Sequence, residues 1–230
     1  MTRNPKKTGG PKTIRETLQS ASQDNSARAE TGETALPPLP SPREIEGTRA
    51  KTLTAAMRIL AEKGVEELSL RAIADSAGIG LASIYHYFAN KEELLLHLAL
   101  TGFHELRQDI AHYQSLPEHA PRMRASALAF FNFVTKKQAL FSLMFDERLM
   151  ARHEALREAE RLTLLAYRNA VAEDDRISPE HQENAAHAIW AMGRGIAATI
   201  SSYPPGTTPP KLVEKMLAGG AYLIYRTETE

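Results

Sequence analysis

Residues 69–93 read SLRAIADSAGIGLASIYHYFANKEE, and this stretch has the spacing of two short helices joined by a tight turn. Ala74 is small enough for the two helices to approach closely, and Gly78, four residues later, suits a turn that needs positive φ. Ile84 follows Gly78 by six residues, where the second helix must pack back onto the first. Together these residues predict a helix-turn-helix.

Capping signals mark the borders of this motif. Ser69 is a favourable N-cap for the first helix, and the second helix is expected from about Leu81 to Phe88. Asn90 with Glu93 three residues later has the pattern of an N-cap with its capping-box partner. A long third helix should therefore begin at Lys91.

One face of the second helix should be free to enter the major groove of DNA. Ile84, Tyr87 and Phe88 are expected to pack inside. The outward set is then Leu81, Ala82, Ser83, Tyr85 and His86.

The stretch from Thr48 to Leu95, which includes AGIGLASIYHYFANKEELL, resembles the TetR family of bacterial regulators. Its Tyr-x-Tyr-Phe followed by Asn-Lys-Glu-Glu is typical of that family's DNA-binding domain. The resemblance implies an all-α homodimer whose N-terminal helices bind a palindromic operator in double-stranded DNA. It also implies a larger C-terminal domain with a dimer interface and a pocket for a small-molecule effector, which would release the repressor from DNA.

By position, the resemblance implies two groups of DNA contacts. Contacts to the phosphate backbone would come from Tyr85, His86 and Lys91, with help from Ser69 and Arg71. Contacts to the bases would come from Leu81, Ala82 and Ser83.

The opening of the second helix departs from the family pattern. Where many members have a polar cap, a basic residue and a glycine, this chain has Gly80, Leu81 and Ala82. Little bidentate hydrogen bonding to bases is therefore expected, and operator reading would rest on thymine methyl groups plus Ser83. The same departure supports the rival interpretation, a helical ligand- or partner-binding protein with weak or lost specific DNA recognition.

Three parts are expected along the chain. Residues 1–47 are poor in large apolar residues and rich in Pro, Ser, Thr and charge, so we expect a disordered extension. The family resemblance implies that residues 48–93 form the DNA-binding domain and residues 94–230 the helical ligand-binding and dimerisation domain. The net charge is zero, but between residues 49 and 91 six basic residues stand against four acidic ones, a local excess that favours DNA.

Apolar spacing predicts helices beyond the motif. One should cover residues 48–63, with Leu53 and Met57 on its buried face, and another should place Leu128 and Phe131 inward. Ser178-Pro179 and Thr208-Pro209 each read as an N-cap followed by proline at the first helical position. The remaining expected helices cover residues 91–113, 146–172 and 179–202.

Aromatic and soft side chains in the C-terminal part are candidates for an effector pocket, although each taken singly is more often ordinary core. Arg194 lies in a Trp-x-x-x-Arg-Gly segment similar to a Trp-x-x-x-His-Gly pattern in one group of TetR-type domains. It can pair with an anionic ligand, with an acid across the dimer, or reach solvent, and structural pairing is favoured. The candidate set is Phe103, Phe131, Met144, Phe145, Tyr167, Trp190 and Arg194.

The helix over residues 179–202 is apolar around most of its circumference, so both of its sides need cover. We expect one side to face a partner subunit in a four-helix bundle completed by the last helix. The predicted interface residues are Gly193, Ala197, Ile200, Leu212, Met216 and Leu223.

Several other kinds of protein are disfavoured. The chain has no cysteine, no nucleophile motif and no Gly-rich phosphate loop, so neither an enzyme nor a bound cofactor is expected. His97, His104 and His112 are seven and eight residues apart, too far for two of them to share a metal ion on one helix. No apolar run approaches the ~20 residues that cross a bilayer, which favours a cytoplasmic protein without a membrane partner.

Overall fold

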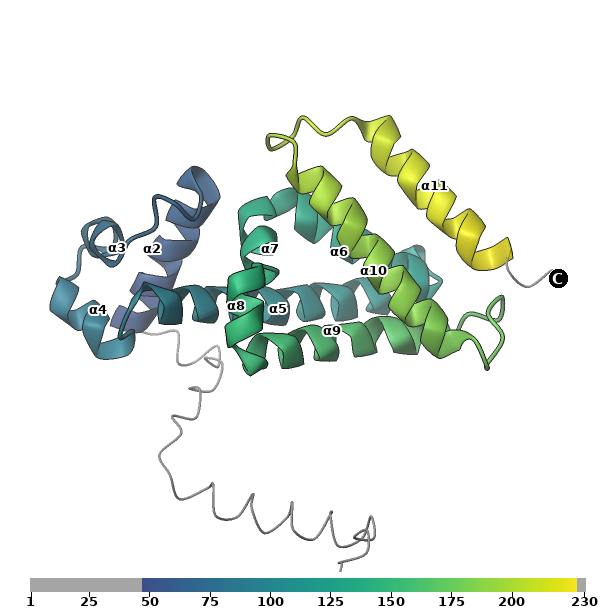
Figure 1. The fold of residues 1–230 in the computed structure, drawn as a ribbon, viewed down its shortest axis with the longest axis horizontal. Helices are drawn as coiled ribbons and strands as arrows, with labels where there is room; N and C mark the ends of the chain where they lie inside the picture. Colours follow the sequence, from purple (N-terminus) through teal and green to yellow (C-terminus); the bar gives the residue numbers. More distant parts are fainter. Residues whose placement is uncertain (1–46, 227–230) are drawn as a thin grey trace, which may run out of the picture. The chain divides into compact units, whose positions relative to one another are not determined.

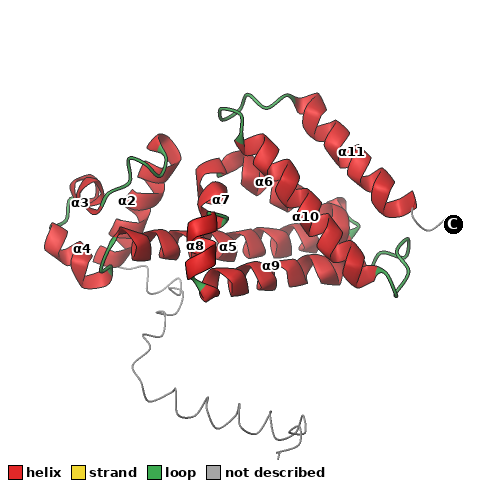
Figure 2. Ribbon diagram, viewed as in Figure 1, coloured by secondary structure: helices red, strands yellow, loops and turns green. Residues whose placement is uncertain are grey.

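The computed structural model describes residues 47–226, which form helices and loops with no strand among them (Figure 1, Figure 2). The all-α prediction is therefore confirmed. The extension expected over residues 1–47 lies, apart from Gly47, outside the described residues. The helices are α2 (Thr48–Lys63), α3 (Leu70–Ala77), α4 (Leu81–Tyr87), α5 (Lys91–Ser115), α6 (Arg122–Lys136), α7 (Gln138–Met144), α8 (Glu147–Arg152), α9 (Glu154–Ala172), α10 (Gln182–Ser201) and α11 (Pro210–Arg226), with a 3-10 helix η1 (Pro117–His119).

The predicted helix-turn-helix is confirmed in α3 and α4. The Ser69 hydroxyl accepts a hydrogen bond from the Ala72 N–H at 3.1 Å and caps α3. Gly78 ends α3 in the left-handed region, at φ 65°. Ala74 and Ile84 are buried between the two helices, and α2 packs on both of them. We call α2–α4 the head.

The long helix α5 leads from the head to the remaining helices, which we call the body (Figure 1). Its start is capped as predicted, because the Asn90 side chain accepts from the Glu93 N–H at 2.9 Å. The Glu93 carboxylate in turn accepts from the Ala89 N–H at 2.7 Å, one residue before the cap. Along its length α5 packs against α2, α6, α7 and α9, so it contacts both the head and the body.

Aromatic rings fill the core of the body. Phe130 of α6 lies edge-on to Phe141 of α7, to Tyr167 of α9 and to Trp190 of α10, with ring centroids 5.5, 6.2 and 5.8 Å apart. The Tyr167 hydroxyl donates to the Ser126 carbonyl at 3.1 Å, and complete burial raises the pKa of Tyr167 well above its usual value. This cluster ties α6, α7, α9 and α10 together.

Two predicted helix faces are wrong in part. On α6, Phe130 and Phe133 are buried, whereas Leu128 is exposed and Phe131 half-buried. On α2, Leu53 and Met57 are half-buried against the core, and the buried stripe also includes Ala55, Ala56 and Ile59. Both helices carry apolar residues on neighbouring faces, so periodicity alone did not decide which face turns inward.

Two predicted helix boundaries also need correction. The helix expected over residues 146–172 is broken at His153, where the backbone is extended, and forms α8 and α9. Ser178 and Pro179 form a turn, closed by a bond from the His181 N–H to the Ser178 carbonyl, and α10 begins only at Gln182. The helix start expected at Thr208-Pro209 is displaced by one residue, to Pro210.

No helix of the described chain is both long enough and apolar enough to span a membrane. The predicted boundary between two domains at residue 93 falls within the first turn of α5. The division into two domains stays a prediction.

Candidate nucleic-acid interface

The outward face of α4 is exposed. Tyr85 has 54% of its surface accessible, and Leu81, Ala82, Ser83 and His86 are also exposed. The inward side is held by Ile84 within α4 and by Phe88 directly after it, both fully buried. A short helix is thereby fixed on one side and presents the other to solvent, which is the arrangement that a major-groove reader needs.

Tyr87 was expected inside, and this prediction is wrong because 41% of its surface is accessible. The α4 helix ends at Tyr87, and the extended backbone of Phe88 turns the Phe88 ring into the core in its place. The Tyr87 ring lies edge-on to His86, with centroids 5.1 Å apart. Ile84 and Phe88, four residues apart, are enough to anchor so short a helix. This spacing of two apolar residues was visible in the sequence and could have predicted that Tyr87 is not needed inside.

The remaining predicted DNA contacts have different surroundings. Ser69 and Arg71 are exposed at the start of α3. Lys91 is half-buried, and its ammonium group donates to the Val65 carbonyl at 3.1 Å. Lys91 therefore joins the α2–α3 loop to α5, and any phosphate contact would have to use another of its three N–H groups.

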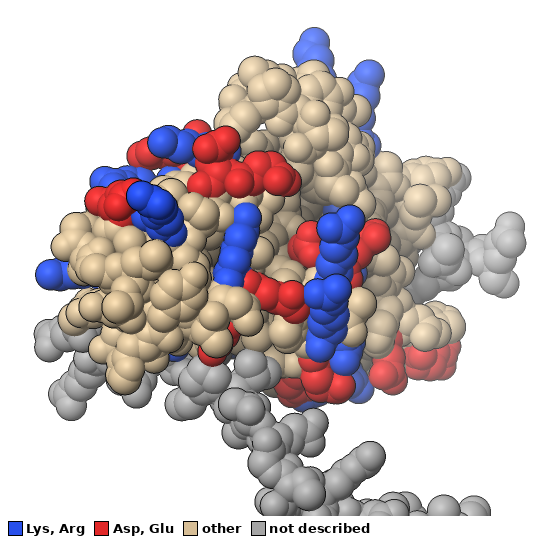
Figure 3. Space-filling model, turned by 60° about the vertical axis from the view of Figure 1, so that its left-hand side comes forward, with Lys and Arg blue, Asp and Glu red and all other residues tan. Residues whose placement is uncertain are grey.

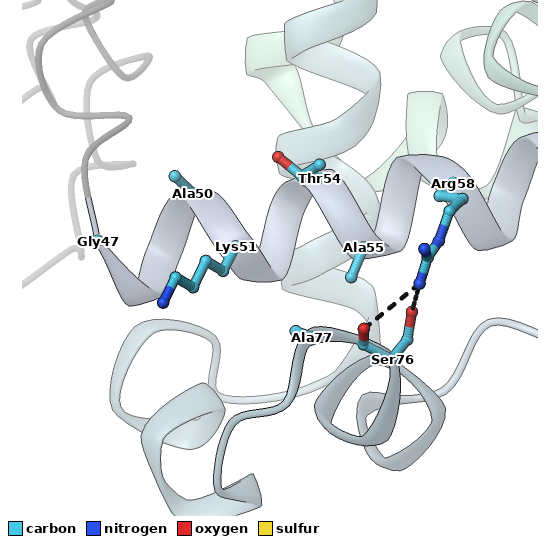
Figure 4. Close-up of a pocket in the computed structure, with 8 residues that line it drawn as sticks. All are labelled: Gly47, Ala50, Lys51, Thr54, Ala55, Arg58, Ser76 and Ala77. Atoms are coloured by element: carbon cyan, nitrogen blue, oxygen red, sulfur yellow. Dashed lines mark hydrogen bonds between the residues drawn. The ribbon is translucent and has the colours of Figure 1, made fainter.

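A cleft of about 530 Å³ between α2 and α3 shows how the head is braced (Figure 4). Arg58 reaches across from α2, and its guanidinium donates to the carbonyl and to the hydroxyl oxygen of Ser76 near the end of α3. Lys51 lines the same cleft. Arg58 thus stabilises the packing of α2 on α3.

Charge on the head is interspersed rather than collected in one basic patch. Figure 3, which brings this end of the molecule forward, shows Lys and Arg side chains alternating with Asp and Glu. Arg49 lies over the Phe88 ring at 5.9 Å. Among the described residues, Lys51, Lys63 and Arg71 form no ion pair, so their charge is available to attract DNA.

Three consecutive residues anchor the first turn of α5 to three places. Lys91 binds the α2–α3 loop, and Glu93 binds Ala89, two residues after the end of α4. Glu92 accepts from Arg152 at 2.9 Å and from His153 at 3.0 Å, at the break between α8 and α9. This turn therefore connects the head to the body.

His97 lies one turn further along α5 and is almost completely buried, with 2% of its surface accessible. Its Nδ1–H donates to the Glu93 carbonyl at 2.9 Å, and its ring edge meets Phe88 with centroids 5.3 Å apart. Its Nε2 is buried without a hydrogen-bond partner. Burial lowers the pKa of His97, and the nearby positive charge of Arg49 acts in the same direction, so the ring is held neutral.

The predicted effector residues do not line one cavity. Phe131, Tyr167 and Trp190 border a small hollow of about 50 Å³, whereas Phe145 and Arg194 border a groove of about 470 Å³ between α7 and α10. Phe103 and Met144 are fully buried and line neither of these two hollows.

Arg194 has the structural pairing that the sequence analysis favoured. Its guanidinium donates to Glu160 Oε1 of α9 at 3.0 Å and lies 4.4 Å over the Phe145 ring. Trp190 Nε1 donates to the same carboxylate oxygen at 3.0 Å. The charge of Arg194 is therefore paired within the chain.

The predicted dimer residues are split between the core and the surface. Ala197 and Ile200 are buried in the subunit's own core, and Gly193 faces Phe130, so these three do not form an accessible face. Leu212 and Met216 of α11 are half-buried, and Leu223 has 67% of its surface accessible. The exposed side of α10 carries Ala188, Ala191, Gly195 and Ala198.

Within residues 47–226 no three His, Asp or Glu side chains converge on a point that could hold a metal ion.

Comparisons with known proteins agree with this geometry. Residues 53–98 match the family described as bacterial regulatory proteins, tetR family. The HTH-type transcriptional repressor KstR2 of Mycobacterium tuberculosis is 42% identical over 60 residues, 26% of this chain and 30% of that repressor. The chain thus spans about a third of the length of the first curated relatives that it matches.

Similarity extends into the body at lower identity. An uncharacterised HTH-type regulator of Haemophilus influenzae is 29% identical over 157 residues, 67% of this chain and 75% of that protein. The solved structure of a protein of unknown function from Rhodococcus sp. RHA1 superposes with a TM-score of 0.65 at 24% identity, covering 83% of this chain and 100% of that one. The latter similarity concerns the fold.

Proposed function

Since this chain belongs to the TetR family of transcriptional regulators, we propose that it is a ligand-responsive repressor that binds a palindromic operator as a homodimer. Regulators of this family bind DNA and small-molecule ligands, and they are not enzymes. The proposal depends on the exposure of α4. Ile84 and Phe88 hold the helix on its inner side, and its outer side, with Tyr85, is accessible to solvent.

In the proposed complex, α4 enters the major groove. Leu81, Ala82 and Ser83 at its start face the bases, with Ser83 the only hydrogen-bonding side chain of the three. Tyr85, His86 and the exposed Tyr87 contact phosphates, together with Ser69, Arg71 and a remaining N–H of Lys91. Two heads about 34–36 Å apart would read adjacent half-sites on one face of DNA.

We place the dimer interface on α10 and α11. In the C-terminal half of α10 the exposed residues are the small ones Ala191, Gly195 and Ala198, which permit close helix approach. Leu223 and Tyr222 of α11 add exposed apolar surface that a partner would cover. Leu212 and Met216 would contribute from the half-buried side of α11.

The effector would act by shifting the dimer between two arrangements of its heads. A ligand that binds one arrangement more tightly changes its population without any chemistry. The anchored first turn of α5 is the contact through which the body would set the position of the head.

The test uses the full chain and the DNA upstream of its own gene, in a mobility-shift assay at several salt concentrations. We expect saturable binding that is stronger than to unrelated DNA of the same length and that weakens as salt rises. Binding no stronger than to unrelated DNA would reject the proposal and favour the rival, a helical ligand- or partner-binding protein. A DNA-bound regulator of this kind would act in the cytoplasm.

A further inference from the structure

A small apolar cavity lies between α6, α9, α10 and α11, with a volume of about 50 Å³. Phe130, Tyr167 and Trp190 form its inner wall, and all three are buried. Their rings lie 5.4 to 6.2 Å apart, in edge-on contact. A wall of interlocked rings in a packed core is not easily deformed.

The polar groups of this wall are satisfied elsewhere. The Tyr167 hydroxyl donates to the Ser126 carbonyl at 3.1 Å. The Trp190 Nε1–H donates to the Glu160 carboxylate at 3.0 Å. A charged molecule that entered the cavity would lose its hydration and gain no partner in return, which is strongly unfavourable.

The larger groove beside Arg194 is a weaker candidate for an effector. An organic anion there would have to compete with Glu160, which already holds the guanidinium at 3.0 Å. The groove is also lined by Ala191, Gly195 and Ala198, which belong to the α10 face proposed for the partner subunit.

The outer wall of the cavity is adaptable. It includes Met192 and Leu217, both half-buried, and methionine has three rotatable bonds. The α11 helix rests directly on Met192, because a Cβ added at Gly220 would overlap its sulfur. Apolar cavities that bind benzene measure roughly 150 Å³, so this cavity must widen to hold a ring of that size. Movement of the Met192 and Leu217 side chains would widen it.

We propose that the effector is a compact, uncharged apolar molecule that enters this cavity by displacing Met192 and Leu217 beneath α11. Because α11 packs mainly on α10, such a displacement would move the helix that we assign to the dimer bundle. This inference rests on the proposed function and specifies the chemistry of its ligand.

Trp190 is the only tryptophan of the chain, so its fluorescence reports directly on the cavity. The full-length protein is titrated with toluene, benzoate and benzylammonium, three probes that share a ring and differ in charge. We expect a saturable change with toluene, and affinities for the two ions at least about tenfold weaker. If toluene showed no saturable binding, the proposal would be overturned. Benzoate binding as tightly as toluene would also overturn it, and would indicate Arg194 as the binding residue instead.

A glycine in the cavity wall and an exposed leucine outside it provide a variant and its control. A Cβ at Gly193 of α10 would lie 3.7 Å from Phe130, an ordinary contact inside the cavity wall, whereas Leu162 of α9 is exposed and does not line this cavity. Gly193→Ala should weaken toluene binding about tenfold, and Leu162→Ala should change it less than about twofold. Equal effects of the two variants would contradict the site. None of these measurements involves DNA, so a failure here is distinct from a failure to bind the operator.

Discussion

At the scale of single residues, His97 shows how the head depends on a neutral imidazole. One ring nitrogen is bonded to Glu93, the other has no partner, and the ring supports Phe88 beneath α4. Arg49 of α2 is the nearby positive charge, and Glu93 is the nearby negative one. A proton on the free nitrogen would place an unpaired charge in this packing.

Acid should therefore destabilise the protein through His97. Its pKa is lowered in the folded state, so the unfolded chain, with an ordinary histidine pKa of about 6.5, binds the proton more readily. This contribution to stability is complete above that pH and declines below it, by at most about 1.4 kcal/mol per pH unit. Urea unfolding at successive pH values should show a shallower decline for His97→Leu than for the parent. Parallel curves would contradict this role.

Tyr87 provides a test of the DNA-facing side of α4. Because the ring is exposed, Tyr87→Ala should change the free energy of unfolding by less than about 0.5 kcal/mol. Loss of a hydrogen bond to phosphate should weaken DNA binding roughly tenfold for operator and unrelated DNA alike. Leu162→Ala, at an equally exposed position on α9, is the control, and equal DNA affinity of the two variants would remove Tyr87 from the interface.

At the scale of elements, the first turn of α5 joins the head to the α8–α9 break through Glu92. Arg152 is well exposed, so solvent screens its bond to Glu92. His153 is mostly buried, so its bond to Glu92 is screened less. An exposed ion pair contributes about 0–1 kcal/mol to the free energy of unfolding. The two contacts of Glu92 together should contribute near the upper end of that range.

Glu92→Gln should loosen the head while the body stays intact. Amide hydrogen exchange should become up to about fivefold faster in α4 and the start of α5, with α6 and α9 unchanged. Glu173→Gln, which breaks the exposed pair with Arg122 in the body, is the matched control. If both variants leave exchange in α4 unaltered, the Glu92 contacts do not couple the two parts.

At the scale of the whole molecule, α10 and α11 leave an apolar surface on the described chain. Leu223 has 67% of its surface accessible, and the small residues of α10 lie exposed on the neighbouring helix. A dimer formed through this surface would place two heads on one DNA molecule.

Leu223→Glu should weaken this association, because two carboxylates would be buried without partners across the symmetry axis. Sedimentation equilibrium should show the dimer dissociation constant rising at least about tenfold, with weaker operator binding as a consequence. Leu162→Glu should leave both unchanged. A fully dimeric Leu223→Glu protein would place the interface elsewhere.

What the sequence determined by itself is local. The Ser69 cap, the left-handed Gly78 and the Asn90 cap depend on residues a few positions apart, and each is where the pattern predicted it. The helix-turn-helix, the all-α class and the resemblance to the TetR family follow from such signals.

Only the tertiary structure decided which of two apolar faces turns inward, as with Phe130 against Phe131 and Phe88 against Tyr87. It also decided that Arg194 meets Glu160, 34 residues away along the chain, and that a helix breaks where His153 meets Glu92. These outcomes depend on contacts between distant segments, whose partners no local spacing specifies.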